Sequence, residues 1–146
     1  MRILVLQGPN LNMLGKRKAE HYGAVTLDEI HRRMTERAAE LGCKVICFQS
    51  NHEGYLVDKV HEERDNVQGI IINPAGLTGF GYSLRDAIED SLLPMVEVHL
   101  SNIHAREEFR RHSMFSGIAT GIIAGFKWRG YLAALEMLVE MVENGA

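Results

Sequence analysis

Tyr22 and Arg17 are residues whose types and spacing suggest chemistry. They lie five positions apart within residues 8–24, which also hold Asn10 and the basic triplet of residues 16–18. A tyrosine removes a proton only as the phenolate, and a nearby guanidinium group stabilises that anion. One interpretation is a mobile loop whose arginine and tyrosine close over a substrate. The other is a solvated surface loop with an exposed tyrosine.

His99 is a second candidate, because a histidine side chain can both give and take a proton near neutral pH. It lies at the end of a predicted strand and is followed by Leu100, Ser101 and Asn102. The backbone N–H groups after it and the Ser101 hydroxyl are suited to bind a carboxylate. The alternative interpretation is a structural histidine that takes no part in chemistry.

Three other patterns predict no site of their own. Residues 104–112 mix charges of both signs, which for most of these residues is typical of a solvated helical face rather than a nucleic-acid surface. Gly76, Gly79 and Gly81 do not form the Gly-x-Gly-x-x-Gly pattern of a phosphate-binding loop. The seven histidines include no pair with metal-ligand spacing on one helix, so we expect no metal.

The elements that must position these residues alternate between apolar runs and helical patterns, which indicates a parallel sheet. Apolar runs predict five strands, at residues 3–6, 45–48, 69–72, 95–100 and 118–123. Apolar side chains three and four positions apart predict helices at residues 27–41, 54–64, 83–92 and 131–142. We therefore predict a doubly wound α/β fold, a three-layer sandwich around a five-stranded parallel sheet.

Polar residues follow four of the predicted strands, at residues 7–12, 49–53, 73–81 and 99–102. Because ligands of such sheets bind at the carboxyl ends of the strands, we expect these loops to form one site. Residues 8–24 carry no helical pattern, and loops of this length in a compact domain are usually lids or binding loops. We therefore predict an active-site lid over residues 8–24.

Length, charge and cysteine content restrict the class of protein. A chain of 146 residues is one domain, and a formal net charge of −3 is too mild to imply nucleic acid or a membrane surface as partner. Cys43 and Cys47 are too few for a disulfide framework, and we expect both to be small buried side chains. No apolar run approaches the ~20 residues of a membrane span, and residues 1–6 lead into no signal-peptide cleavage site. These observations predict a cytoplasmic protein.

Short motifs run through the whole chain in order. The first covers residues 8–17 and continues to Tyr22-Gly23, and later ones cover residues 49–54, 71–74, 84–87, 97–102 and 106–110. Together they resemble the motifs of the type II 3-dehydroquinate dehydratases. The resemblance implies a single catalytic domain over residues 1–146 with a flavodoxin-like fold. It also implies a homo-oligomer, a dodecamer of four trimers.

The activity implied by this resemblance is anti elimination of water from 3-dehydroquinate through an enolate, without metal or organic cofactor. Tyr22 would be the base that removes a proton next to the ketone, and Arg17 would keep it ionised. Asn10 would hold a water against the enolate oxygen, and His99 would protonate the departing hydroxyl. The implied substrate-binding groups are Asn73, the backbone N–H groups of Leu100 and Ser101, the Ser101 hydroxyl, Arg110, and Asp86 reaching a neighbouring subunit's site.

The chain departs from the family pattern at two places. Gly79 stands where the family has a substrate-contacting histidine, and Lys18-Ala19 replaces the Glu-Pro that usually follows the loop arginine. The base, the acid and the carboxylate site are retained, so we expect elimination in the shikimate pathway or in quinate breakdown. The alternatives are a lyase of the same fold for a related hydroxylated cyclohexanone acid, and a non-catalytic small-molecule-binding paralogue.

Overall fold

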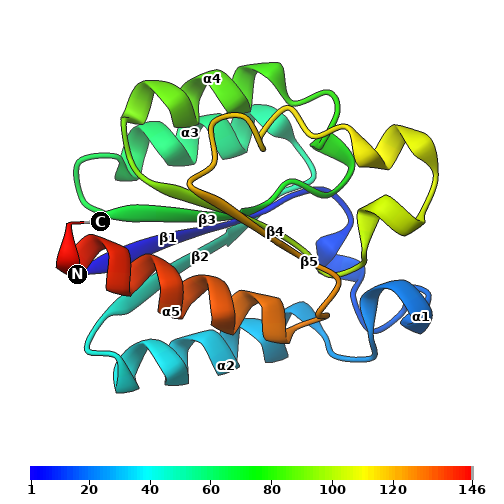
Figure 1. Cartoon of the computed structure of the whole chain (residues 1–146), viewed down its shortest axis with the longest axis horizontal. Helices are drawn as coiled ribbons and strands as arrows, with labels where there is room; N and C mark the ends of the chain where they lie inside the picture. Colours follow the sequence, from blue (N-terminus) through cyan, green and yellow to red (C-terminus); the bar gives the residue numbers. More distant parts are fainter. Residues whose placement is uncertain (146) are drawn as a thin grey trace.

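A five-stranded parallel sheet lies at the centre of the computed structural model, which describes residues 1–145 (Figure 1). The strands run in the order β2-β1-β3-β4-β5. This is the order of flavodoxin-like folds, so the predicted fold class is confirmed. Residue 146 of the predicted domain lies outside the described part. The strand bounds are β1 Arg2–Gln7, β2 Lys44–Gln49, β3 Gly69–Asn73, β4 Met95–His99 and β5 Gly121–Ala124.

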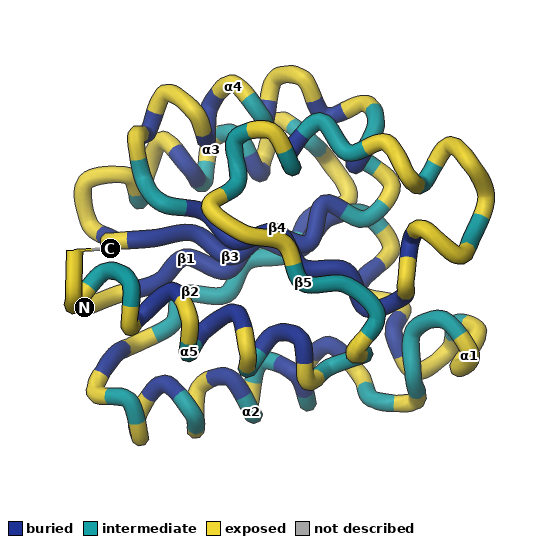
Figure 2. Tube along the Cα trace, in the orientation of Figure 1, coloured by how far each residue is buried: buried dark blue, intermediate teal, exposed yellow. Residues whose placement is uncertain are grey.

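Two pairs of helices cover the two faces of the sheet and complete the three layers. α2 (Leu27–Glu40) and α5 (Arg129–Asn144) lie on one face, and α3 (Glu53–Glu63) and α4 (Tyr82–Ser91) lie on the other (Figure 1). Figure 2 shows that buried and exposed positions alternate along each of these helices. Such alternation is expected of amphipathic helices that bury one stripe against a sheet.

Alternate strand residues feed two separate cores. Within β1, Ile3 and Val5 pack with α2 and α5, whereas Leu4 and Leu6 pack with α3 and α4. Successive side chains of a strand point to opposite faces, so the sequence of β1 supplies both layers at once. Burial of this apolar area, at about 25 cal/mol per Å², is the main force that holds the layers together.

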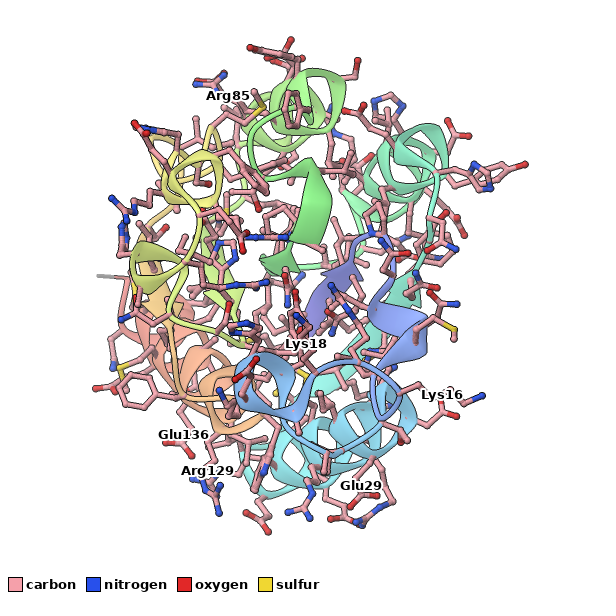
Figure 3. The ribbon with its side chains drawn as sticks, turned by 90° about the vertical axis from the view of Figure 1, so that its right-hand side faces the viewer. Lys16, Lys18, Glu29, Arg85, Arg129 and Glu136 are labelled. Atoms are coloured by element: carbon pink, nitrogen blue, oxygen red, sulfur yellow. The ribbon has the colours of Figure 1, made fainter. Side chains whose placement is uncertain are left out.

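α2 begins and ends where its sequence signals predict. The Thr26 hydroxyl accepts a hydrogen bond from the Glu29 N–H at 3.2 Å, and Gly42 follows the helix with a φ of 75°. On the outer side, Arg37 Nε donates to a carboxylate oxygen of Glu136 in α5 at 2.8 Å, and Figure 3 labels this glutamate. The buried stripe has helical spacing and consists of Leu27, Ile30, Met34 and Ala38.

Residues 8–24 contain a single 3-10 turn, Leu11–Met13, and the short helix α1, Ala19–Tyr22, which are too short to show a hydrophobic repeat. Two predictions about local structure were wrong. β5 starts at Gly121 rather than at residue 118, because residues 118 and 119 make turn hydrogen bonds to preceding carbonyls. Cys47 is only partly buried, since β2 is an edge strand. Among residues 1–145, no helix combines the length and apolar character needed to cross a membrane.

Candidate active site

A pocket lies at the carboxyl ends of β1, β3 and β4, on the side that faces the viewer in Figure 3. Three of the four polar loops predicted to converge contribute to its walls. The fourth loop contributes indirectly, because the Asn51 side-chain oxygen accepts a hydrogen bond from the Asn10 N–H at 2.9 Å. Most of the predicted site residues line the pocket, namely Arg17, Tyr22, Asn73, His99, Leu100, Ser101 and Arg110.

Two guanidinium groups converge on the hydroxyl of Tyr22. Arg17 Nη2 donates to the Tyr22 Oη at 2.8 Å, and the Arg17 guanidinium carbon lies 3.8 Å from the centre of the tyrosine ring. Arg106 Nη1 donates to the same oxygen at 2.9 Å. Both contacts stabilise negative charge on the phenol oxygen, as a tyrosine base requires. The predicted pairing of Arg17 with Tyr22 is present.

Arg106 is a site residue that the sequence analysis missed. Its Nη1 also donates to the Ser101 Oγ at 3.2 Å, so one guanidinium connects the tyrosine with the predicted carboxylate site. Its Nε is buried and has no hydrogen-bond partner among the described residues. This N–H can therefore donate to a molecule bound in the pocket that Arg106 lines. Arg106 is therefore an exception to the solvated helical face that was predicted for most of residues 104–112.

His99 is buried and paired with Glu97, a second residue that the sequence analysis missed. The His99 Nε2 lies 2.6 Å from a Glu97 carboxylate oxygen. Ser113 Oγ and Ser116 Oγ donate to Glu97 at 2.8 and 3.0 Å. Burial alone would raise the pKa of the Glu97 carboxyl, but the hydrogen bonds from His99, Ser113 and Ser116 outweigh burial and hold this pKa below its usual value.

The Glu97 carboxylate determines which ring nitrogen of His99 is free for chemistry. An ionised carboxylate only accepts hydrogen bonds, so the His99 Nε2 must carry the hydrogen that points to it. The other ring nitrogen, Nδ1, remains available, and His99 lines the pocket. When Nδ1 is protonated, the ring carries a positive charge that the adjacent carboxylate stabilises. The pair is therefore suited to deliver a proton into the pocket.

Asn73, Leu100 and Ser101 form the predicted polar cluster beside His99. All three are buried and line the pocket. The Asn73 side-chain oxygen accepts a hydrogen bond from the Ala75 N–H at 3.1 Å, and its Nδ2 donates to the Tyr131 hydroxyl at 2.9 Å. The Ser101 hydroxyl is held by Arg106, as described above. Amide, hydroxyl and guanidinium donors thus gather where a carboxylate is expected to bind.

Two predicted site residues do not line this pocket in the described chain. Asn10 is exposed and has a left-handed backbone conformation with a φ of 69°. Asp86 lies on α4 with its side chain 70% exposed, and its carboxylate is 3.5 Å from a guanidinium nitrogen of Arg85. Figure 3 places Arg85 at the α4 margin of the face that carries the pocket. Within one chain, Asp86 therefore does not take part in the site.

Arg110 and Gly79 lie on the pocket rim with two exposed aromatic side chains. Arg110 lines the pocket and its Nε donates to the Glu107 carboxylate. Phe80 and Phe109 are 69% and 60% exposed and also line the pocket. Gly79 offers no side chain to a ligand, so recognition on this side falls to its neighbours. Among residues 1–145, no group of three or more His, Cys, Asp or Glu side chains is placed to hold a metal ion.

Comparison with known sequences gives a consistent result over nearly the full chain. The family model described as "Dehydroquinase class II" matches residues 1–139. The 3-dehydroquinate dehydratase of Herpetosiphon aurantiacus is 51% identical over 140 residues, covering 96% of this chain and 97% of that protein. The enzyme of the same name from Roseiflexus castenholzii is 54% identical over 139 residues, covering 95% and 88%.

Comparison with solved structures agrees with the sequence matches. The crystal structure of the type II dehydroquinase from Propionibacterium acnes superimposes with a TM-score of 0.91 at 41% identity, covering 95% of this chain and 96% of that one. A 3-dehydroquinate dehydratase-like protein from Bifidobacterium longum gives a TM-score of 0.73 at 29% identity, covering 98% of both chains. Sequence, fold and pocket agree, and the chain belongs to the class II dehydroquinase family.

Proposed function

We propose that this protein removes water from 3-dehydroquinate to give 3-dehydroshikimate. The observation that carries the proposal is the Tyr22 hydroxyl, which accepts hydrogen bonds from Arg17 and Arg106 inside the pocket. A protein that only bound a small molecule would have no use for a phenol held in this way. The family membership of the chain and the names of its relatives support the choice of substrate.

In the first step the Tyr22 phenolate takes a proton from the carbon next to the substrate ketone. The electrons of the broken C–H bond form a C=C bond, and the carbonyl oxygen becomes an enolate. Preorganised donors stabilise such charge more effectively than bulk water. We assign Asn10 to hold a water against this oxygen. Its exposed side chain sits on the loop that carries Tyr22, and its backbone is anchored to Asn51.

In the second step the enolate electrons return and expel the substrate hydroxyl. His99 gives its Nδ1 proton to the departing oxygen, so water leaves, and Glu97 stabilises the protonated ring before transfer. The net change at the protein is a proton gained by Tyr22 and one lost by His99, which exchange with solvent restores. Tyr22 reaches the pocket from α1 and His99 from the end of β4. The base and the acid thus come from two separate elements, which is compatible with anti elimination.

The substrate carboxylate is assigned to the polar cluster beside His99. Asn73, the Ser101 hydroxyl and the backbone N–H groups of Leu100 and Ser101 supply neutral donors there. The unpartnered Nε of Arg106 adds a cationic donor at the same side of the pocket. Arg110 is assigned to the ring hydroxyls from its position on the rim.

An absorbance assay for the conjugated enone tests the proposed function. Purified protein and 3-dehydroquinate are expected to give an increase in enone absorbance that depends on enzyme concentration. Absence of product with correctly folded protein would contradict the proposal. A related hydroxylated cyclohexanone acid, assayed in parallel, distinguishes the alternative lyase, because that enzyme would convert it faster than 3-dehydroquinate.

We also propose a cytoplasmic dodecamer of four trimers in which Asp86 reaches a neighbouring subunit's site. The exposed position of Asp86 and the exposed aromatic side chains Phe80 and Tyr82 support contacts between subunits on this side. The free thiols of Cys43 and Cys47 support a reducing compartment. Sedimentation of the purified protein is expected to give the mass of twelve chains, and a monomer would contradict the proposed assembly.

A further inference from the structure

A buried hydrogen-bond chain runs from the pocket, through Asn73, to α2. Asn73 Nδ2 donates to the Tyr131 hydroxyl at 2.9 Å, and that hydroxyl donates to the Gln7 side-chain oxygen at 2.7 Å. Gln7 Nε2 then lies 3.3 Å from the His31 Nε2. Gln7 and Tyr131 are both fully buried, so each polar atom in this chain depends on its protein neighbours.

Each hydrogen bond in this chain has a defined direction. Burial raises the pKa of Tyr131, so its hydroxyl stays protonated. This hydroxyl donates its one hydrogen bond to the Gln7 side-chain oxygen. The same oxygen can then only accept from Asn73. The Gln7 side-chain oxygen accepts from Tyr131, so the Gln7 Nε2 is the group that faces His31 and donates to it. His31 accepts on Nε2 when its proton is on Nδ1.

A separate contact fixes the other side of the Asn73 amide. Its oxygen accepts the Ala75 N–H at 3.1 Å, and Ala75 has a left-handed backbone with a φ of 51°. Such a conformation is unfavourable for a residue with a Cβ, so the hydrogen bond helps to hold this turn. The Asn73 oxygen and one Nδ2 hydrogen are therefore used inside the protein. The second Nδ2 hydrogen remains for the pocket that Asn73 lines.

We propose that Tyr131 is a positioning residue for substrate binding: its hydroxyl, held by Gln7, turns Asn73 so that the second Nδ2 hydrogen meets the substrate carboxylate. The inference rests on the proposed function, because it requires Asn73 to bind that carboxylate. A flipped Asn73 would present its oxygen and repel the same group. A phenylalanine would fill the same volume, but it would leave the Gln7 oxygen without its donor and the Asn73 Nδ2 without its acceptor, so the hydroxyl is the part of Tyr131 that sets the Asn73 amide.

Tyr131→Phe tests the proposal by separating KM from kcat. Loss of one neutral hydrogen bond that orients a binding group is expected to raise KM about three- to tenfold. The kcat value is expected to stay within about twofold, since the contact to the carboxylate is the same in ground and transition states. Ser91→Ala is the matched control, because Ser91 is also buried and its hydroxyl donates to the Ile88 carbonyl at 2.6 Å. Both variants are expected to lose stability, but only Tyr131→Phe changes KM.

A double-mutant cycle with Asn73→Ala identifies the route of the effect. If Tyr131 acts through Asn73, Tyr131→Phe adds no further increase in KM once the Asn73 amide is gone. Two results would overturn the inference. One is a KM in the double variant that equals the product of the two single increases, and the other is an unchanged KM in Tyr131→Phe. Should Tyr131→Phe fail to fold, Gln7→Met removes the hydroxyl's acceptor and is expected to raise KM in the same way. Inactivity of the wild-type protein would contradict the proposed function instead, so the two failures are distinguishable.

Discussion

Tyr22 and Tyr131 show how the surroundings of one residue type set two different roles. The Tyr22 oxygen accepts hydrogen bonds from two guanidinium groups, and charge-assisted bonds of this kind are stronger than bonds between neutral groups. The Tyr131 oxygen is buried among neutral amides, and burial raises its pKa. In the proposed mechanism the first tyrosine takes a proton, whereas the second keeps its proton and orients its neighbours.

Tyr22→Phe is expected to lose nearly all turnover while substrate still binds. Phenylalanine keeps the shape of the side chain but has no oxygen to receive the proton. Steady-state rates measure the first effect, and calorimetric titration with 3-dehydroquinate measures the second. A variant that kept more than about a tenth of the wild-type rate would have lost only about 1.4 kcal/mol of barrier reduction. Tyr22 would then not be the base.

Arg106→Gln is expected to lower kcat by about 10- to 100-fold. One of the two charge-assisted hydrogen bonds to Tyr22 is lost, and such bonds contribute about 1.5–3 kcal/mol each. Arg129→Gln is the control, because Arg129 is exposed on α5 and lies outside the pocket. Equal rates for Arg106→Gln and the control would show that Arg17 alone supports the tyrosine.

The sequence predicted the site residues that follow the strands, but not those that depend on packing across the sheet. Arg17 was found because it shares a short loop with Tyr22, whereas Arg106 lies 84 positions away from Tyr22 among charges that suggested surface ion pairs. Glu97 carried a detectable signal. A carboxylate inside an otherwise apolar strand, two positions before His99, must share that histidine's face of the sheet.

At the scale of elements, the segment between β3 and α4 forms part of the pocket rim, and its backbone leaves space for a side chain at Gly79. An added Cβ at Gly79 would have the His112 carbonyl oxygen as its nearest neighbour, at 3.7 Å, which is an ordinary contact. An added Cβ at Gly8 would lie 2.4 Å from the Pro74 carbonyl oxygen, which no side chain tolerates. The close approach of the Pro74 backbone therefore requires a glycine at position 8. No comparable contact requires a glycine at position 79.

Gly79→Ala is therefore expected to keep kcat within a few-fold and to fold normally. Any effect is expected in KM, because the proposed base Tyr22 and the proposed acid His99 lie on other elements, α1 and β4. Gly8→Ala is the contrasting variant and is expected to lower stability, because the β1 and β3 ends must separate. Thermal unfolding and steady-state kinetics of both variants check this. A hundredfold loss of kcat in folded Gly79→Ala would show that this rim takes part in the proton transfers.

The elements that the sequence predicted well are those with several turns or a continuous apolar run. α2 was confirmed in its cap, its buried stripe and its end, because each has a local cause. α1 is a single turn, and β5 is exposed at the sheet edge, so neither shows a full hydrophobic pattern. Their placement comes from contacts made by the whole chain, such as Lys127 Nζ donating to the Glu20 carbonyl oxygen at 2.6 Å.

For the whole molecule, the partly buried His31 and the buried Glu97 link the stability of the fold to pH in the same direction. Burial lowers the pKa of His31 below its usual 6.5, against an opposing effect of Asp28, so the folded state disfavours the protonated ring. The hydrogen bonds around Glu97 lower its pKa below 4.5 despite its burial, so the folded state favours the carboxylate. In both cases the unfolded chain binds more protons, and the free energy of unfolding decreases as pH falls.

The melting temperature is therefore expected to fall in two stages on acidification. The first stage starts as the pH drops below about 6.5, where His31 of the unfolded chain gains a proton, and the second below about 4.5, where Glu97 does. His31→Gln is expected to remove the first stage and Glu97→Gln the second, because an amide does not titrate in this range. Measurements at about 1 M salt, where the Debye length is about 3 Å, suppress the exposed ion pairs of α2. A melting temperature independent of pH in this range, or a first stage that persists in His31→Gln, would contradict the assignment.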